Sequence, residues 1–174
     1  MPTNDRPSCI THWREIEEPD NNHYRGVDEL MRIGAPFGRH FGLQRLGIHH
    51  HRLPPGRRTS FPHAESTEEE FVYVIEGTPE VWVDGNLHRL QAGDGVGFPA
   101  GTGIAHTFIN NSDAEVHLLV VGEATKPDNR IVYPLHPERR RMIPHWWDNA
   151  PVRPLGPHDG MPDTVRASKA EKPR

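Results

Sequence analysis

Residues 54–77 read PPGRRTSFPHAESTEEEFVYVIEG and place three potential ligand side chains around the start of an apolar run. His63 and Glu65 are two positions apart, so on a β-strand both side chains point to the same face. Glu70 is seven positions from His63, which is the wrong parity for one continuous strand. The polar residues 66–69 must therefore interrupt the chain before Glu70 begins the next strand.

Residues 93–110 read GDGVGFPAGTGIAHTFIN, a Gly/Pro turn followed by a strand that His106 opens and whose same side carries Phe108 and Asn110. If His106 faces inward, it can meet the first cluster and complete a set of two imidazoles and two carboxylates. Such a set suits Zn, Fe, Mn or Ni, and without thiolates it is a poor site for soft metals. With positions left open to water or substrate, it lets a metal act as a Lewis acid or activate dioxygen.

The chain around these two segments predicts an all-β domain. Short runs rich in β-branched and aromatic residues alternate with Gly, Pro, Asn and Asp, and no segment keeps a helical apolar period for three turns. Asp84 and Gly85 form a hairpin turn signal because both tolerate a positive φ. We expect a compact antiparallel sandwich or barrel whose strands lie within residues 43–53, 69–77, 79–84, 86–90, 95–100, 105–110 and 116–123.

At these residues the chain resembles the cupin superfamily. The family's first motif is a Gly, a His-x-His pair, a Glu and a Gly, and the corresponding residues here are Gly56, His63, Glu65, Glu70 and Gly77. Its second motif corresponds here to Gly93, Pro99, Gly101, His106 and Asn110. The resemblance covers roughly residues 41–123 and is closest to the small single-domain bacterial cupins of unassigned activity. It implies a double-stranded β-helix jelly roll with one divalent metal inside.

The resemblance implies a metal held by His63, Glu65, Glu70 and His106. The chain departs from the family pattern where Glu65 replaces the second histidine and where two extra residues precede His106. Glu65 either coordinates the metal, which we favour because a buried carboxylate needs a cation beside it, or forms an ion pair with an arginine and leaves three ligands. The arginine would be Arg57 or Arg58.

Two further assignments concern neighbouring carboxylates and histidines. Glu69 is an alternative to Glu70, but the six-residue distance to the closing glycine favours Glu70. The catalytic base is unassigned, with His50 and His117 as candidates. The triplet at residues 49–51 is expected to be mostly structural, because adjacent strand residues point to opposite faces.

The chain divides into a barrel and two arms. We assign residues 1–39 to an irregular N-terminal arm with at most a short helix around residues 27–32, and residues 40–124 to the barrel. Residues 125–174 form a Pro-rich C-terminal extension in which regular structure is not expected. The last 12 or so residues, 163–174, have the composition of a disordered tail.

Composition excludes several classes of protein. With 34% hydrophobic residues and a mean hydropathy of −0.74, the 174-residue chain has no membrane-spanning stretch. A net charge of −4 and scattered basic residues argue against a nucleic-acid partner. The lone Cys9 and a polar N-terminus without a leader pattern favour the cytoplasm. The runs FVYVI and HLLVV are apolar on both faces, so we expect the arms or a second subunit to cover them and predict a homodimer.

These observations predict a mononuclear, divalent-metal-binding cupin that acts as a metal-dependent isomerase, lyase or oxygenase on a small polar organic molecule. The alternative is a non-enzymatic module that binds a small molecule or sugar. Metal content and retention of ligand binding by metal-stripped protein distinguish the two.

Overall fold

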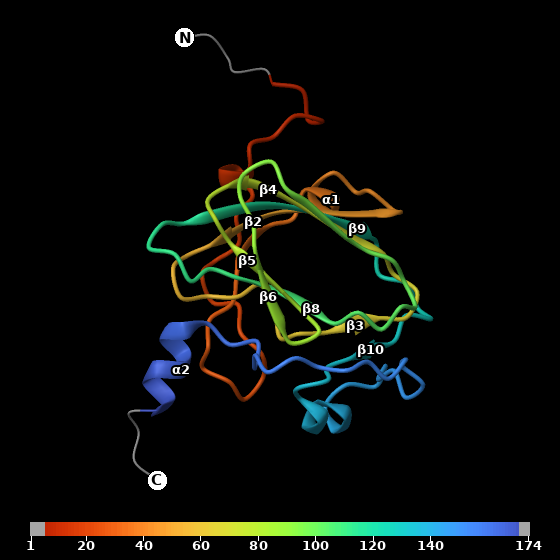
Figure 1. Ribbon diagram of the computed structural model, residues 1–174. Coiled ribbons are helices and arrows are strands. Elements are labelled where there is room, and N and C mark those ends of the chain that lie inside the picture. The colour runs from red at the N-terminus through yellow and green to blue at the C-terminus, as the bar shows by residue number, and fades with distance from the viewer. Residues whose placement is uncertain (1–5, 171–174) are drawn as a thin grey trace.

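The computed structural model describes residues 6–170, and these form an antiparallel jelly-roll barrel flanked by two arms (Figure 1). The larger sheet has the order β1-β2-β9-β4-β7, and the smaller sheet has the order β6-β5-β8. The strands of the larger sheet are β1 (Ile33–Ala35), β2 (Leu46–Leu53), β9 (Val116–Glu123), β4 (Glu70–Glu76) and β7 (Gly95–Phe98). Those of the smaller sheet are β6 (Asn86–Arg89), β5 (Glu80–Val83) and β8 (His106–Ile109). Two short strands, β3 (Ala64–Glu65) and β10 (Ile131–Val132), pair with each other.

The all-β prediction is confirmed, and a strand lies within each of the seven predicted segments. The hairpin between β5 and β6 has φ angles of 45° at Asp84 and 88° at Gly85, as a two-residue turn with both residues left-handed requires. The C-terminal segment crosses this turn, where the Gly156 N–H donates to the Asp84 carbonyl at 2.7 Å. A Cβ at Gly85 would lie 2.2 Å from the Gly156 nitrogen, so only glycine fits.

The main core lies between the two sheets and uses alternate residues of the strands. Val72 and Val74 of β4 are buried together with Leu118 of β9. The intervening side chains of β4 point outward, and Phe71 and Ile75 remain 44% and 45% exposed. Strand β4 thus carries apolar side chains on both of its faces. Its inner face is covered by the opposite sheet, while its outer face, which we expected an arm or a second subunit to cover, is exposed in the single chain.

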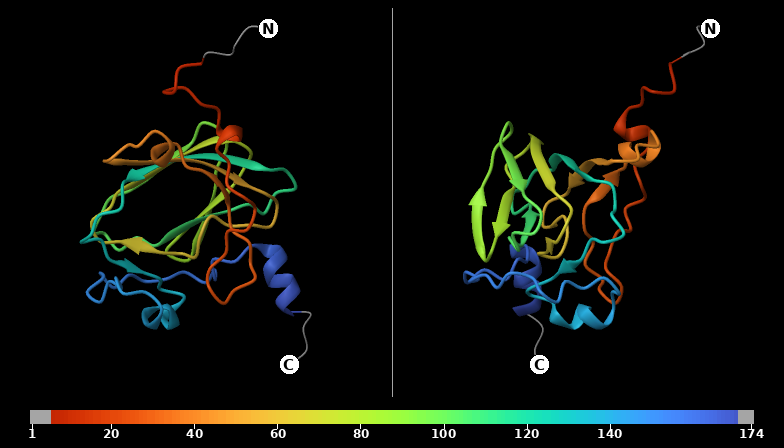
Figure 2. Two further views of the ribbon diagram at one scale, coloured as in Figure 1. Left: turned by 180° about the vertical axis from the view of Figure 1, so that it is seen from behind. Right: turned by 90° about the vertical axis from the view of Figure 1, so that its right-hand side faces the viewer.

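The N-terminal arm lies along the outer face of β2 and β9 (Figure 2). Trp13, in the short 3-10 helix η1 (Trp13–Glu15), stacks on His50 with ring centroids 4.5 Å apart. Arg52 binds both Glu17, at 2.9 Å, and Glu115, at 2.8 Å. The arm is therefore more ordered than predicted, and it supplies β1 and the short helix α1 (Phe37–His40).

The prediction of a short helix around residues 27–32 is wrong. Leu30 instead forms an isolated antiparallel bridge with His23, and the Met31 N–H donates to the Asn22 carbonyl at 2.8 Å. Met31 is 1% exposed and packs in a cluster with Phe61. Burial of this side chain against the barrel therefore outweighs the local helical preference.

The C-terminal extension also contains regular structure, contrary to prediction. It includes β10, the 3-10 helix η2 (Pro137–Arg141) and the helix α2 (Asp163–Ala170). The expected disorder of residues 163–174 is thus wrong for 163–170, while 171–174 lie outside the described residues. The Asp163 N–H at the start of α2 donates to Asn111 Oδ1 at 2.9 Å, which satisfies a helix N-terminal donor. Within residues 6–170, no helix has the length and apolar character needed to cross a bilayer.

Candidate metal centre and its pocket

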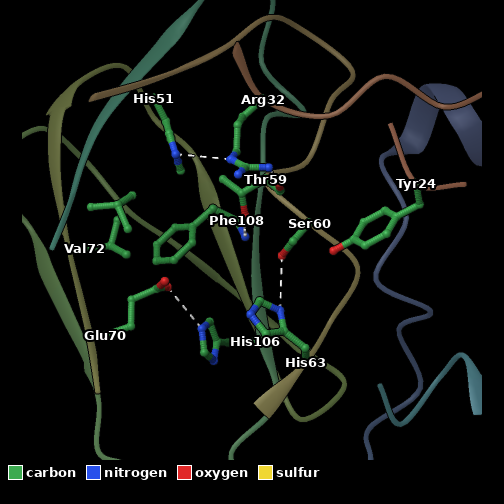
Figure 3. Close-up of a pocket in the computed structure, with 11 residues that line it drawn as sticks. Tyr24, Arg32, His51, Thr59, Ser60, His63, Glu70, Val72, His106 and Phe108 are labelled. Carbon is green, nitrogen blue, oxygen red and sulfur yellow. Dashed lines mark hydrogen bonds and ion pairs between the residues drawn. The ribbon is translucent and has the colours of Figure 1, made fainter. Parts of the chain in front are cut away.

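A cavity of about 180 Å³ lies in the barrel, with part of its wall formed by the N-terminal arm (Figure 3). Its apolar walls come from Val72, Phe108 and Val120. At one end in Figure 3 lie Glu70 and His106, with His63 beside them. The cavity is therefore small and mostly lined by polar and ionisable side chains, with one apolar part of its wall, and such a lining suits a small polar ligand.

Backbone pairing holds His63 and His106 next to each other. The His106 N–H donates to the His63 carbonyl at 3.0 Å, the reciprocal bond is 3.2 Å, and the ring centroids are 5.1 Å apart. His63 Nδ1 lies 2.9 Å from the Phe61 carbonyl, and His106 Nδ1 lies 3.3 Å from the Ile104 carbonyl. A carbonyl only accepts, so each Nδ1 carries a proton and Nε2 is the ring atom left to act as a ligand. The hydrogen bond of His106 Nε2 with Glu70 needs a proton on that nitrogen, which a bound metal would displace.

Glu70 supplies the carboxylate of the candidate metal centre. It is the first residue of β4, and its Oε1 lies 3.2 Å from His106 Nε2. Burial by itself would raise the pKa of Glu70, but the hydrogen bond with His106 and the charges of His106 and His63 bring it below its ordinary value. Phe98 stacks on His106 with centroids 3.4 Å apart and planes within 6°, which fixes the orientation of the imidazole.

The donor set fits a divalent metal in its chemistry. His106 Nε2 and Glu70 Oε1 lie 3.2 Å apart, so both atoms would be within reach of one ion. Burial, followed by the charge of His106, lowers the pKa of His63 to about 4, so its ring is neutral at neutral pH, as a ligand must be. Among residues 6–170, however, no three His, Cys, Asp or Glu side chains are already assembled at metal-binding spacing.

Glu65 does not line this cavity. It pairs with Ile131 across β3 and β10, and its side chain lines a neighbouring pocket with Lys126 and His145. Burial and the charges of Glu68 and Glu70 raise the pKa of Glu65 to about 7.

The alternative in which Glu65 pairs with an arginine is wrong. Arg57 binds Asp20 and Arg58 binds Glu29. The neighbouring Glu69 is exposed, so of the two adjacent glutamates it is Glu70 that lines the cavity.

The family model of the cupin domain matches residues 49–122. The chain carries a cupin domain. The matched stretch contains His63, Glu70 and His106 together with the strands that hold them.

Relatives of this cupin have more than one described activity. CurC, a polyketide synthase protein of Streptomyces cyaneus, is 33% identical over 106 residues, which are 60% of this chain and 64% of CurC. A cupin-superfamily sugar phosphate isomerase from Silicibacter pomeroyi is 36% identical with a TM-score of 0.56, over 59% of this chain and 64% of that one. The polyketide cyclase RemF from Streptomyces resistomycificus shares the fold with a TM-score of 0.58 and 19% identity, over 79% and 94% of the two chains. The match thus covers less than two thirds of the first two relatives.

The two histidines considered as catalytic bases lie on the wrong face of the cupin sheet. His50 and His117 project outward from β2 and β9, where His117 Nδ1 lies 3.1 Å from His50 Nε2 and Trp13 covers both rings. Neither lines the cavity. The alternation that carries His51 inward carries His50 outward, so this assignment is corrected.

Three further ionisable residues line the cavity and were not among the predicted site residues. His51 is 6% exposed and lies on the inward side of β2 with Leu53, so strand alternation could have identified it. Tyr24 and Arg32 come from the N-terminal arm, outside the matched cupin stretch. No local spacing links them to the cupin motifs, because only the folded arm brings them to the barrel.

Proposed function

We propose that this cupin is a metal-dependent enzyme that binds one divalent ion, Zn, Fe, Mn or Ni, and acts on a small polar organic molecule. His63, Glu70 and His106 would hold the ion. The observation that carries this proposal is the direction of the two imidazoles, whose Nδ1 atoms are engaged by backbone carbonyls. Their Nε2 atoms are thereby left to bind beside the Glu70 carboxylate.

The reaction we favour is isomerisation or lyase chemistry next to a carbonyl group, with oxygenation as the alternative. A divalent ion in this position supplies a Lewis acid for a carbonyl or enolate oxygen. Sugar phosphates and polyketides, named in the descriptions of two relatives, both contain carbonyl groups with acidic neighbouring C–H bonds. The shared element is the carbonyl chemistry, and it supports the proposal without identifying the substrate.

The chain's own residues hold the ligands and shape the cavity. Ser60 Oγ lies 3.3 Å from His63 Nδ1 and assists the Phe61 carbonyl in fixing that ring. Val72 and Phe108 form a buried apolar part of the cavity wall, next to which electrostatic interactions are less screened than in bulk water.

Metal analysis of matched variants tests the proposal. Protein purified without added metal should contain about one ion per chain, and Glu70→Gln and His106→Ala should each lose it. Glu65→Gln is the matched control, because Glu65 lines a different pocket and its loss should leave the metal content unchanged. Folding is checked by circular dichroism. A folded wild-type protein that takes up none of the four metals would contradict the proposal, and loss of metal in Glu65→Gln would restore the four-ligand set.

Two further predictions stay open. Residence in the cytoplasm stays a prediction that rests on the lone Cys9, which has no second cysteine to pair with in the chain. Assembly into a homodimer is supported by the outer face of β4, where Phe71, Tyr73 and Ile75 are each at least 40% exposed.

A further inference from the structure

We propose that Arg32 makes this cavity selective for a substrate that carries an anionic oxygen group, a carboxylate or a phosphate. This inference rests on the proposed function, because it names the substrate class of the same cavity. Arg32 immediately precedes β1, which pairs with β2 through Ile33 and Arg52. Figure 3 shows its guanidinium at the end of the cavity away from Glu70 and His106.

The hydrogen bonds of Arg32 go to neutral acceptors. Its Nε donates to His51 Nε2 at 3.1 Å and its Nη1 to the Thr59 carbonyl at 3.4 Å. Because Nε2 of His51 accepts this hydrogen bond through its lone pair, the ring is in its neutral form and does not offset the guanidinium charge. The two contacts position the side chain and use only part of its five N–H donors.

Arg32 also differs from its neighbours in lacking a carboxylate. Arg39, Arg57 and Arg58 are each paired with an acidic residue of the arm. Among residues 6–170, no Asp or Glu oxygen lies within 4.0 Å of the Arg32 guanidinium. A partly buried cation without a counter-ion is costly, so an anion entering the cavity would be stabilised there.

The net charge of the cavity also favours an anionic ligand. Glu70 is the only acidic residue among the described residues that line it, and its carboxylate contacts His106. A bound divalent ion would offset the negative charge of that carboxylate, so the positive charge of Arg32 would have no counter-ion in the cavity. The hydroxyl groups of Ser60 and Tyr24 also line the cavity, Ser60 next to His63 in Figure 3, and add neutral polar groups to its wall.

Titration calorimetry with inorganic phosphate and with pyruvate tests this inference in the intact protein. Arg32→Gln should weaken binding of at least one probe by about 10- to 100-fold, as expected when a hydrogen bond to a charged group is lost. Arg89→Gln removes the same charge from an exposed position on β6 and should bind as wild type does. The comparison of phosphate with pyruvate identifies which anion the cavity prefers, and pyruvamide, which is uncharged, should not distinguish Arg32→Gln from wild type.

Removing the metal separates this inference from the proposed function. After dialysis against EDTA, the difference between wild type and Arg32→Gln should persist, because Arg32 contacts the anion directly. If the protein contains no metal and the difference is still found, the proposed function fails and the anion site stands. Equal binding by folded wild type and Arg32→Gln, or no binding of either anion to wild type, would overturn the anion site.

A labelling measurement on wild-type protein covers the case in which Arg32→Gln does not fold. Phenylglyoxal modifies accessible guanidinium groups, and mass spectrometry reports each site. Phosphate or pyruvate should lower the rate of Arg32 modification by a fraction about equal to the fraction of protein that has the anion bound. The rate at Arg89 should be unchanged in the same sample. Equal rates at Arg32 with and without a saturating anion would refute the inference.

Discussion

The arm contact at His50 makes a quantitative prediction about the pH dependence of stability. His50 is 5% exposed, is stacked on Trp13 and lies against His117. Burial, followed by repulsion from the charge of His117, lowers the pKa of His50 from 6.5 to about 4. In the unfolded chain the same imidazole has its ordinary pKa and takes up a proton at a higher pH.

The sign and size of the effect follow from this difference. As pH falls from 6.5 to about 4, the unfolded state binds a proton at His50 that the folded state does not, so the folded state loses stability. At 1.36 kcal/mol per pH unit, the gap corresponds to a loss of about 3 kcal/mol. The contribution is fully present above 6.5 and is lost once the pH has fallen to about 4.

His50→Phe isolates the effect, because phenylalanine retains a ring against Trp13 and cannot titrate. Urea unfolding of both proteins, followed by tryptophan fluorescence, gives the free energy of unfolding at each pH. The variant should gain about 3 kcal/mol relative to wild type between about pH 7 and about pH 4, whatever the offset at pH 7. His88→Phe, at an exposed site on β6, is the control. A difference between His50→Phe and wild type that does not change with pH would refute the reasoning.

Three further substitutions test the fold and the assembly. Asn110→Ala should lower the free energy of unfolding by about 3 kcal/mol, measured by urea titration, because the buried amide bonds the carbonyls of Leu53 and Ala114 and accepts from Ser112. Gly85→Ala should cost about 1–3 kcal/mol in backbone strain and more from the clash with Gly156, whereas Gly97→Ala, with open space around its Cβ, should be tolerated. Ile75→Lys should convert the proposed homodimer to a monomer in light scattering; if wild type is itself monomeric, the dimer prediction is wrong.

The barrel was predictable from sequence because its signals are local. Turn residues such as Asp84 and Gly85 mark the ends of strands, and short runs rich in β-branched and aromatic residues mark the strands themselves. The two-residue period of a strand, combined with motif spacing, selected His63, Glu70 and His106, which the structure brings to one cavity. Their role as metal ligands stays a prediction.

The arms were not predictable for the opposite reason, since their order depends on partners far away in the chain. The two-residue strand β10 forms by pairing with β3, and α2 begins where Asn111 accepts from the Asp163 N–H. Arg58, 1% exposed, binds Glu29 and the Gly160 carbonyl, and so joins both arms to the barrel. No window of local sequence contains both partners of these contacts.

The residues proposed to hold the metal lie in the barrel, whereas the residues proposed to select the substrate lie in the N-terminal arm. The matched cupin stretch, residues 49–122, contains the three proposed metal ligands but neither Arg32 nor Tyr24. Two similar proteins are described as a sugar phosphate isomerase and as a polyketide synthase protein, so similarity of this kind does not identify a substrate. In this chain the side chains that can read a substrate's charge come from the arm, where β1 holds Arg32 against His51. A search for the substrate should therefore begin with small carbonyl compounds that carry an anionic group. Substitutions in the arm should change which of these compounds binds and leave the metal content unchanged.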